Sequence, residues 1–353
     1  MDKVKIINEA IERLDKLESN IYVFTQDAKG NAKASIKHSY DIVRVLNENE
    51  YNAHILVENK DYDGVSAWLP VEYDKTSVVS IEEGNLQVRP DDLVIIPELF
   101  AHVMEQIADM PCNKVVLCQS YDYTFETLKP GATWNSFGFN RVITTNFDQK
   151  QYLNDLFKKQ KIDVITPYID DVFTTSEKPQ KPIIAIHTRD QRETMKIVKS
   201  FYVKYPQYKW VTFRDMRGLS QLEFANALSE SCLSVWIDDV SGHGTFPLES
   251  MKCGVPVIGK VPNLKPSWMT DDNGIWTIDA NQIVDLIPAV FKGWLEDRVP
   301  HEIYEEMKDT VKGMTLEQFT KDTLSVFNDI RNSRIEQLQY TIDKFKELEE
   351  QND

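Results

Sequence analysis

The sequence predicts an α/β protein of two doubly wound domains, and three observations carry this prediction. Short β-branched runs without polar alternation recur along the chain, as expected of parallel strands that are buried on both faces. Helix-period segments lie between these runs, and one proline-containing stretch separates two such series. The length of 353 residues fits two domains of roughly 150 residues each. Such sheets bind ligands at the carboxyl ends of their strands, so we expect two Rossmann-like domains facing across a cleft that holds the site.

The first domain is predicted over residues 1–172. It opens with a charged helix, and a second helix begins at Ala34. Residues 170–182 (DDVFTTSEKPQKP) contain two prolines and small polar residues, which favour a linker. The predicted strands of this domain are residues 21–25 (IYVFT), 54–57, 93–97 (LVIIP), 114–118 (KVVLC), 141–145 (RVITT) and 164–167.

The second domain is predicted over residues 173–314, with helices such as 192–205 and 219–228 between its strands. The predicted strands are residues 183–187 (IIAIH), 210–213, 233–237 (LSVWI), 255–258 (VPVI) and 275–278. A long C-terminal helix is predicted over residues 315–353, because Thr315 and Gln318 fit a capping box and one apolar stripe follows. We expect this helix to pack on the first domain, and a homodimer through the helix is the alternative.

Composition and charge narrow the class of protein. The chain has 40 Lys plus Arg against 56 Asp plus Glu, a net charge of −16, which disfavours nucleic-acid binding by phosphate neutralisation. No window has the roughly 18 apolar residues of a membrane span, and the N-terminal residues lack a signal-peptide pattern. The four cysteines are scattered, which predicts buried free thiols in a reducing compartment. The expected location is the cytoplasm.

The stretch of residues 233–260 (LSVWIDDVSGHGTFPLESMKCGVPVIGK) carries the strongest chemical signal. A strand enters a loop over residues 238–244, and a helix begins at about Thr245. Gly242 and Gly244 allow the backbone to approach a ligand, and the amides at a helix start attract anions, so the loop suits a diphosphate. One turn into the helix, Glu249 can accept hydrogen bonds from the vicinal hydroxyls of a ribose.

This pattern resembles the donor-binding signature of nucleotide-sugar glycosyltransferases with the GT-B fold, in the glycogen-synthase-like retaining group, also called glycosyl transferases group 1. The resemblance implies that Glu249 is the ribose-binding glutamate and that Gly242 and Gly244 are the signature glycines. His243 takes the place of a phenylalanine, and Ser241 takes the place of an earlier glutamate. The predicted donor residues from this stretch are therefore Ser241, Gly242, His243, Gly244, Thr245 and Glu249.

The same resemblance implies a basic pair near the diphosphate. Residues 183–196 (IIAIHTRDQRETMK) occupy the place of the strand and loop that supply it, and Arg189 fits the family's arginine. Arg189 is our first catalytic candidate, because a guanidinium forks onto phosphate oxygens and offsets charge on a departing diphosphate. Arg192 or Lys196 takes the role of the lysine, and Arg214 follows the next strand. A solvated arginine paired with Asp190 or Glu193 is the alternative reading of Arg189.

The acceptor side is expected in the first domain. The segment of residues 27–34 (DAKGNAKA) resembles the family's flexible loop, with Gly30 permitting close approach. Asp122, after the strand KVVLC, is a candidate for orienting the acceptor hydroxyl or taking its proton, and an exposed turn aspartate is the alternative. Tyr121 offers a ring for a sugar to stack on. Glu98, after LVIIP, is expected to line the acceptor cleft.

The predicted function is transfer of a sugar from a nucleoside-diphosphate donor, of the UDP or GDP type, to an acceptor hydroxyl with retention. No other cofactor is expected. Asp238 and Asp239 suggest a paired-carboxylate metal site, but a helix start and an arginine make a metal unnecessary, so we predict none. An epimerase or phosphorylase of the same fold, and a non-catalytic nucleotide-binding or scaffold protein, are the alternatives. A glycan, a lipid-linked sugar, a protein, a small metabolite and a modified DNA base all stay open as acceptors.

Overall fold

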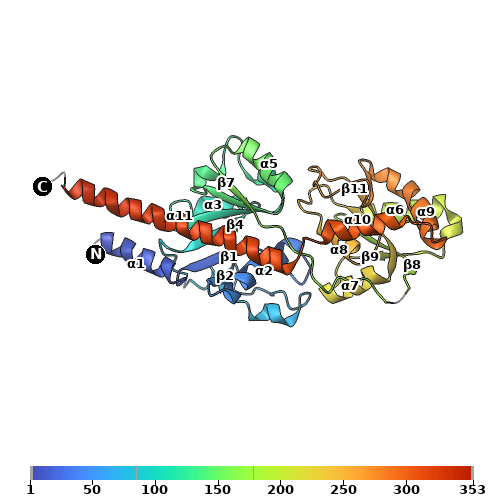
Figure 1. Ribbon diagram of the computed structural model, residues 1–353, viewed down its shortest axis with the longest axis horizontal. Helices are drawn as coiled ribbons and strands as arrows, with labels where there is room; N and C mark the ends of the chain where they lie inside the picture. Colours follow the sequence, from blue (N-terminus) through green and yellow to red (C-terminus); the bar gives the residue numbers. More distant parts are fainter. Residues whose placement is uncertain (1–2, 85, 178, 351–353) are drawn as a thin grey trace. The chain divides into compact units, whose positions relative to one another are not determined.

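The computed structural model describes residues 3–84, 86–177 and 179–350. The chain divides into two compact units. Unit 1 comprises the described residues of 1–66, 70–166 and 319–353, and unit 2 comprises those of 67–69 and 167–318. Each unit is a parallel sheet flanked by helices (Figure 1). Within the described residues, no helix combines the length and the apolarity that crossing a membrane requires.

Unit 1 is built on a seven-stranded parallel sheet in the order β3-β2-β1-β4-β5-β6-β7. The strands are β1 (Asn20–Phe24), β2 (Asn52–Val57), β3 (Val78–Ser80), β4 (Leu93–Pro97), β5 (Asn113–Cys118), β6 (Arg141–Thr144) and β7 (Lys161–Val164). Every residue of β4 is buried, as the continuous apolar run predicted. The strand order reverses between β1 and β4, so the switch point of this sheet lies at their carboxyl ends.

Helices cover this sheet, and the C-terminal helix contributes to the same unit. The helical segments are α1 (Lys3–Asp15), α2 (Ala34–Glu48), α3 (Ala101–Gln106), α4 (Tyr121–Thr127) and α5 (Phe147–Leu156), with the short turns η1 (Val71–Lys75) and η2 (Trp134–Phe137). The long helix α11 (Leu316–Glu350) runs beside α1 in the opposite direction (Figure 1). Leu338 of α11 packs with Ala10 and Leu14 of α1. Part of the apolar stripe of α11 is therefore covered within this chain.

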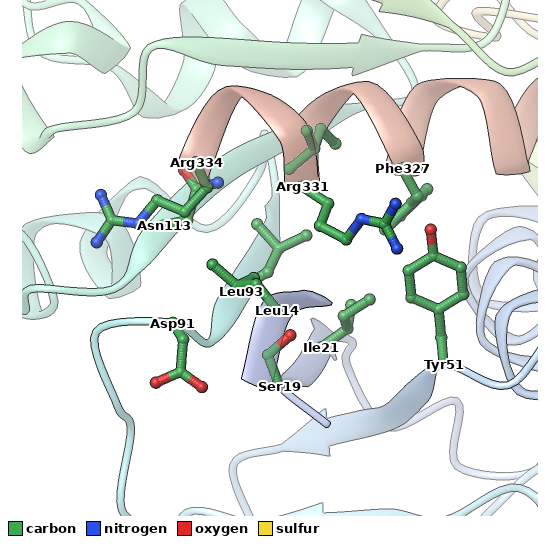
Figure 2. Close-up of a pocket in the computed structure, with 11 residues that line it drawn as sticks. Leu14, Ser19, Ile21, Tyr51, Asp91, Leu93, Asn113, Phe327, Arg331 and Arg334 are labelled. Carbon is green, nitrogen blue, oxygen red and sulfur yellow. The ribbon is translucent and has the colours of Figure 1, made fainter. Parts of the chain in front are cut away.

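Polar contacts also fix α11 to unit 1. The Arg334 guanidinium donates to the carbonyls of Pro90 at 2.7 Å and Pro111 at 2.9 Å, in the loops that lead into β4 and β5. Figure 2 shows the side chains of Arg331 and Arg334 leaving α11 in different directions, with Arg331 on the side of Tyr51. They border a cavity of only about 20 Å³, which is the size of one water molecule.

Unit 2 is built on a five-stranded parallel sheet in the order β12-β11-β10-β8-β9. The strands are β8 (Lys181–Thr188), β9 (Thr212–Asp215), β10 (Ser231–Ile237), β11 (Val257–Lys260) and β12 (Ile275–Thr277). The helical segments are α6 (Gln191–Lys204), α7 (Gln221–Glu230), α8 (Thr245–Lys252), α9 (Ile283–Leu295) and α10 (His301–Val311), with η3 (Pro206–Tyr208) and η4 (Ala280–Gln282). The strand order reverses between β8 and β10, which sets the switch point of this sheet.

Strand boundaries differ from the expected ones where local hydrogen bonds or charges intervene. The strand expected over 210–213 begins at Thr212, because the Val211 amide closes a turn on the Tyr208 carbonyl. The strand expected over 255–258 begins at Val257, since Pro256 has no amide hydrogen and the Val255 amide bonds back to Ser250. The strand expected over 164–167 lies at Lys161–Val164, where charged residues interrupt the apolar pattern of a strand. The short edge strand β3 was not predicted. All four cysteines are buried and free, as expected.

Candidate active site

The loop between β10 and α8 in unit 2 holds the candidate donor residues. Gly244 ends the loop in the left-handed region with φ at +80°, a conformation that glycine adopts without steric cost. Its amide donates to the Ser241 hydroxyl at 3.1 Å. The Ser241 side chain therefore stabilises the conformation of its own loop. Thr245 is the first residue of α8, and Glu249 lies half-buried one turn further along the helix.

His243 is buried in this loop, with 6% of its surface exposed. Neither ring nitrogen has a hydrogen-bond partner within the described part of the chain. Burial lowers the pKa of His243 to about 4, so the ring is neutral near pH 7. A neutral imidazole carries one donor and one acceptor, and leaving both unmet in a buried position is costly. The ring thus offers two polar atoms to a group beside the loop.

A second histidine lies near the same loop. The His187 ring, near the end of β8, stacks on Phe246 of α8 with centroids 5.2 Å apart. Its Nδ1 atom is buried and has no hydrogen-bond partner among the described residues. Burial lowers the pKa of His187, against the opposing fields of Asp238 and Asp215. The start of α8 is therefore flanked by two imidazoles with unmet polar atoms.

Two ion pairs border the loop at the switch point between β8 and β10. Arg189, directly after β8, donates from Nε to one oxygen of Asp238 at 2.8 Å and from Nη2 to the other at 3.3 Å. Lys260, the last residue of β11, pairs with Asp239 at 2.5 Å. Arg189 is half exposed, whereas Asp238 is largely covered. The loop thus has two cations beside it, each already held by a neighbouring aspartate.

The other predicted basic residues make contacts of their own or are exposed, and their roles stay predictions. The Lys196 ammonium bonds to Asn281 at 2.6 Å, and the Arg214 guanidinium pairs with Glu230 at 3.3 Å. Arg192 is exposed in the first turn of α6. Lys260 was missed, although its place at the end of the run VPVIGK was a usable signal, because the carboxyl ends of parallel strands share one edge.

Glu98 in unit 1 is almost completely buried, with 1% exposed. Its carboxylate accepts from the backbone amides of Gln119 at 3.1 Å and Ser120 at 2.8 Å. Burial raises the pKa of Glu98 to about 7, and these amide bonds oppose the shift. The side chain therefore fastens the end of β4 to the turn that follows β5, instead of lining an open surface.

Tyr121 and Asp122 lie in the first turn of α4, directly after the turn held by Glu98. Burial and the neighbouring Asp122 raise the pKa of Tyr121 to about 12. The Tyr121 ring packs against Tyr152, with centroids 4.8 Å apart. Gly30 is exposed in the loop after β1 with φ at +73°, and no atom lies within 4 Å of the position of a β-carbon there. The roles of these three residues stay predictions.

The candidate metal ligands Asp238 and Asp239 can be compared with the other side chains that the structure describes. Within the described residues, no group of three or more His, Cys, Asp or Glu side chains could hold a metal ion. Asp238 and Asp239 each pair with a cation instead. Metal independence stays a prediction.

Known proteins resemble the chain in sequence and in fold. No protein-family model matches the sequence. An α-1,6-glucosyltransferase of Actinobacillus pleuropneumoniae serotype 7 (strain AP76) is 28% identical over 230 residues, which is 62% of this chain and 66% of the relative, just under two thirds. The solved structure of pneumococcal O-GlcNAc transferase GtfA, in complex with UDP and GlcNAc, superposes with a TM-score of 0.66 at 10% identity, covering 88% of this chain and 99% of the other. The chain therefore has the GT-B fold of these glycosyltransferases.

A further solved structure supports the GT-B fold of the chain. Anabaena HepE, solved in complex with UDP-glucose, superposes with a TM-score of 0.63 at 10% identity and covers 88% of this chain and 99% of that one. The predicted resemblance and the predicted fold, two doubly wound parallel sheets with a long C-terminal helix, are confirmed.

Proposed function

We propose that the chain transfers a sugar from a nucleoside-diphosphate donor to an acceptor hydroxyl. The start of α8 carries this proposal. Helix-start amides attract a phosphate, and Arg189 and Lys260 lie beside the loop as cations. His243 adds two buried polar atoms without partners in the described chain, a state that buried groups rarely keep without a ligand or water. A diphosphate complements the positive charge of these two cations, and Glu249 is our candidate for binding the ribose hydroxyls.

In the proposed reaction these residues stabilise the negative charge that develops on the diphosphate. In the transfer, the bond from the sugar C1 to the diphosphate oxygen breaks, a bond from C1 to the acceptor oxygen forms, and the hydroxyl proton leaves with the diphosphate. Negative charge grows on the departing diphosphate. A preorganised guanidinium at Arg189 and the dipole of α8 stabilise that charge without a metal ion.

We propose UDP-glucose as the donor and retention as the stereochemical outcome. The relative is named for glucosyl transfer, and the two solved neighbours hold UDP or UDP-glucose. The resemblance of the loop signature to the retaining group supports retention. GDP-sugars are the alternative donors.

Thermal-shift measurements with UDP, GDP, ADP, CDP and their glucose conjugates, with and without magnesium, test donor binding, because a ligand of the native state raises its melting temperature. We expect a shift with UDP and UDP-glucose that does not need magnesium and that Glu249→Ala abolishes. Glu302→Ala, at an exposed position on α10 in the same unit, is the matched control and keeps the shift. No shift with any diphosphate contradicts the proposal.

Product analysis with labelled UDP-glucose tests the reaction. We expect label in a glycosylated acceptor, with an α-anomeric signal in the first product formed. Epimerised donor without acceptor identifies an epimerase, a requirement for orthophosphate identifies a phosphorylase, and binding without turnover of any donor identifies a non-catalytic protein. Each of these three results overturns the transferase proposal.

A further inference from the structure

A pocket of about 350 Å³ opens in unit 1 at the carboxyl ends of β2 and β3. This volume is within the range of roughly 300–1,000 Å³ of small-molecule sites. Val57 and Ser80, the last residues of the two strands, line it. Its buried floor is made by Tyr40, Val57, Val65 and Tyr73. None of the residues that the sequence singled out lines this pocket.

Two tyrosine hydroxyls meet in the pocket. The oxygens of Tyr40 and Tyr62 lie 3.0 Å apart in a hydrogen bond. That bond uses one of their two hydroxyl hydrogens and leaves the other for a ligand oxygen. Burial, Tyr62 and the carboxylates of Asp74 and Asp27 all raise the pKa of Tyr40. The pair therefore remains protonated and keeps one hydroxyl hydrogen that a ligand in the pocket can accept.

The charges around the pocket exclude an anion. Asp63, Asp74 and Glu83 line it against a single cation, Lys60. Three carboxylates repel a phosphate and offer acceptors to hydroxyl groups. They do not form a metal site, because no cluster of the described acidic, histidine or cysteine side chains could hold an ion. The chemistry that remains is a neutral polyhydroxyl compound or an organic cation.

The combination of groups favours the neutral compound. A sugar ring has apolar C–H faces and a rim of hydroxyls, which match an aromatic and aliphatic floor with carboxylates at the opening. The tyrosine pair, with Tyr40 buried and Tyr62 half-buried, supplies a hydroxyl donor, and a fully protonated polyamine has no acceptor for it. The charge of Asp27 raises the pKa of both Tyr40 and Tyr62, so Asp27 lies close to the pair. Asp27 belongs to the loop that also contains Gly30. The pocket thus lies near the loop expected to meet the acceptor.

We propose that this pocket binds a neutral sugar unit of the acceptor, so that the acceptor is a glycan and not a phosphorylated metabolite. The proposal rests on the proposed function, because only a transferase has an acceptor. The pocket would be a second acceptor contact on unit 1, separate from Tyr121 and Asp122, and it would select acceptors by their chemical class.

Ligand-observed saturation-transfer NMR on the full chain tests the pocket with glucose, maltose, isomaltose, glucose 6-phosphate and spermidine. We expect a neutral saccharide to bind, glucose 6-phosphate to bind at least 3-fold more weakly than glucose, and spermidine not to compete. Tyr62→Phe removes one hydroxyl and keeps the ring, and we expect it to weaken saccharide binding at least 3-fold. Asp74→Asn, at an exposed rim position, is expected to act in the same direction. Tyr340→Phe, at an exposed tyrosine of α11, is the matched control.

The proposal is overturned if no saccharide binds, if spermidine displaces it, if the phosphorylated sugar binds as well as glucose, or if Tyr62→Phe and Asp74→Asn bind like the wild type. The thermal shift with UDP, recorded on the same samples, separates this failure from a failure of the proposed function. A wild-type chain without a UDP shift contradicts the donor site, whatever the saccharide data show. With activity in hand, Tyr62→Phe should raise KM for the acceptor at least 3-fold and leave KM for the donor unchanged.

Discussion

Trp268 and His243 are joined by a hydrogen bond from the indole Nε1 to the His243 carbonyl at 3.0 Å. The same indole lies 2.7 Å from the position that a β-carbon on Gly244 would take. Trp268 therefore constrains the backbone of the candidate donor loop at two adjacent residues. The loop owes its shape to a tryptophan that lies 24 residues beyond Gly244 in sequence.

Gly244→Ala is expected to destabilise unit 2 and to abolish the thermal shift with UDP. Gly218→Ala is the matched control, because Gly218 also has a positive φ, of +74°, but has no atom within 4 Å of its β-carbon position. Both variants share the backbone cost, so their difference isolates the clash with Trp268. Overpacking predicts a further loss of about 1–3 kcal/mol for Gly244→Ala in urea unfolding. Equal losses of unfolding free energy in the two variants would show that the Trp268 indole moves aside without an energetic cost.

Asp238→Asn is expected to strengthen UDP binding, because the aspartate competes with the diphosphate for Arg189. The asparagine oxygen can still accept the Val240 amide, now 3.2 Å from the Asp238 carboxylate, so the loop keeps this contact. A part-exposed ion pair contributes about 1 kcal/mol, which corresponds to a roughly 3- to 10-fold lower Kd by isothermal titration calorimetry. Glu305→Gln, which breaks the exposed pair with Lys308 on α10 in unit 2, is the control. Weaker binding in Asp238→Asn would show that the aspartate positions the arginine instead.

Acid is expected to destabilise unit 2 through His243. The folded pKa is about 4 against 6.5 for an ordinary histidine, so the unfolded chain takes up a proton first as the pH falls from 6.5 to 4. Linkage converts this difference into about 3 kcal/mol of stability lost over that window. His243→Phe, which introduces the residue found at this place in the signature that the loop resembles, should remove this loss from urea-unfolding curves recorded at several pH values. His301→Phe, at an exposed position, should keep the wild-type pH dependence.

The sequence indicated much of the fold because burial on both faces of a parallel strand leaves an uninterrupted apolar run. β4 matches its predicted bounds for this reason. The strands that were displaced or missed, such as β7 and β3, are short, charged or at the sheet edge. Their positions follow from pairing with neighbours, and that pairing leaves little trace in local composition.

Contacts of the candidate site could be predicted where its residues are close in sequence, and could not be predicted where they depend on strand order. The glycine loop and the helix start lie in one continuous stretch. The pairing of Arg189 with Asp238, 49 residues apart, exists because β8 and β10 are neighbours, and the alternatives considered from sequence, Asp190 and Glu193, are sequence neighbours of Arg189. Likewise the pocket beside Tyr40 and Tyr62 combines a helix with two strand ends.

Rising pH is expected to destabilise unit 1 through Glu98, with the sign opposite to that of His243. The folded pKa is about 7 against 4.5 for an ordinary glutamate, so between these values the unfolded chain loses its proton first and unfolding becomes easier as the pH rises. The wild type should therefore lose about 3 kcal/mol relative to Glu98→Gln from pH 4.5 to 7. Glu126→Gln, at an exposed position on α4, is the matched control.

Hydrogen exchange in urea, read on peptides from β4 and β5, measures this difference within unit 1. The free energy of unfolding could instead change with pH in the same way in the wild type and in Glu98→Gln. That result would show that the backbone amides of Gln119 and Ser120 stabilise the carboxylate enough to cancel the effect of burial on its pKa. The expected divergence means that burial outweighs them, so that near pH 7 the turn leading into Tyr121 and Asp122 depends on a carboxyl group that is close to half ionised. An acceptor contact made through that turn would then weaken as the pH rises through 7, because ionising a buried carboxylate loosens the turn that presents both side chains.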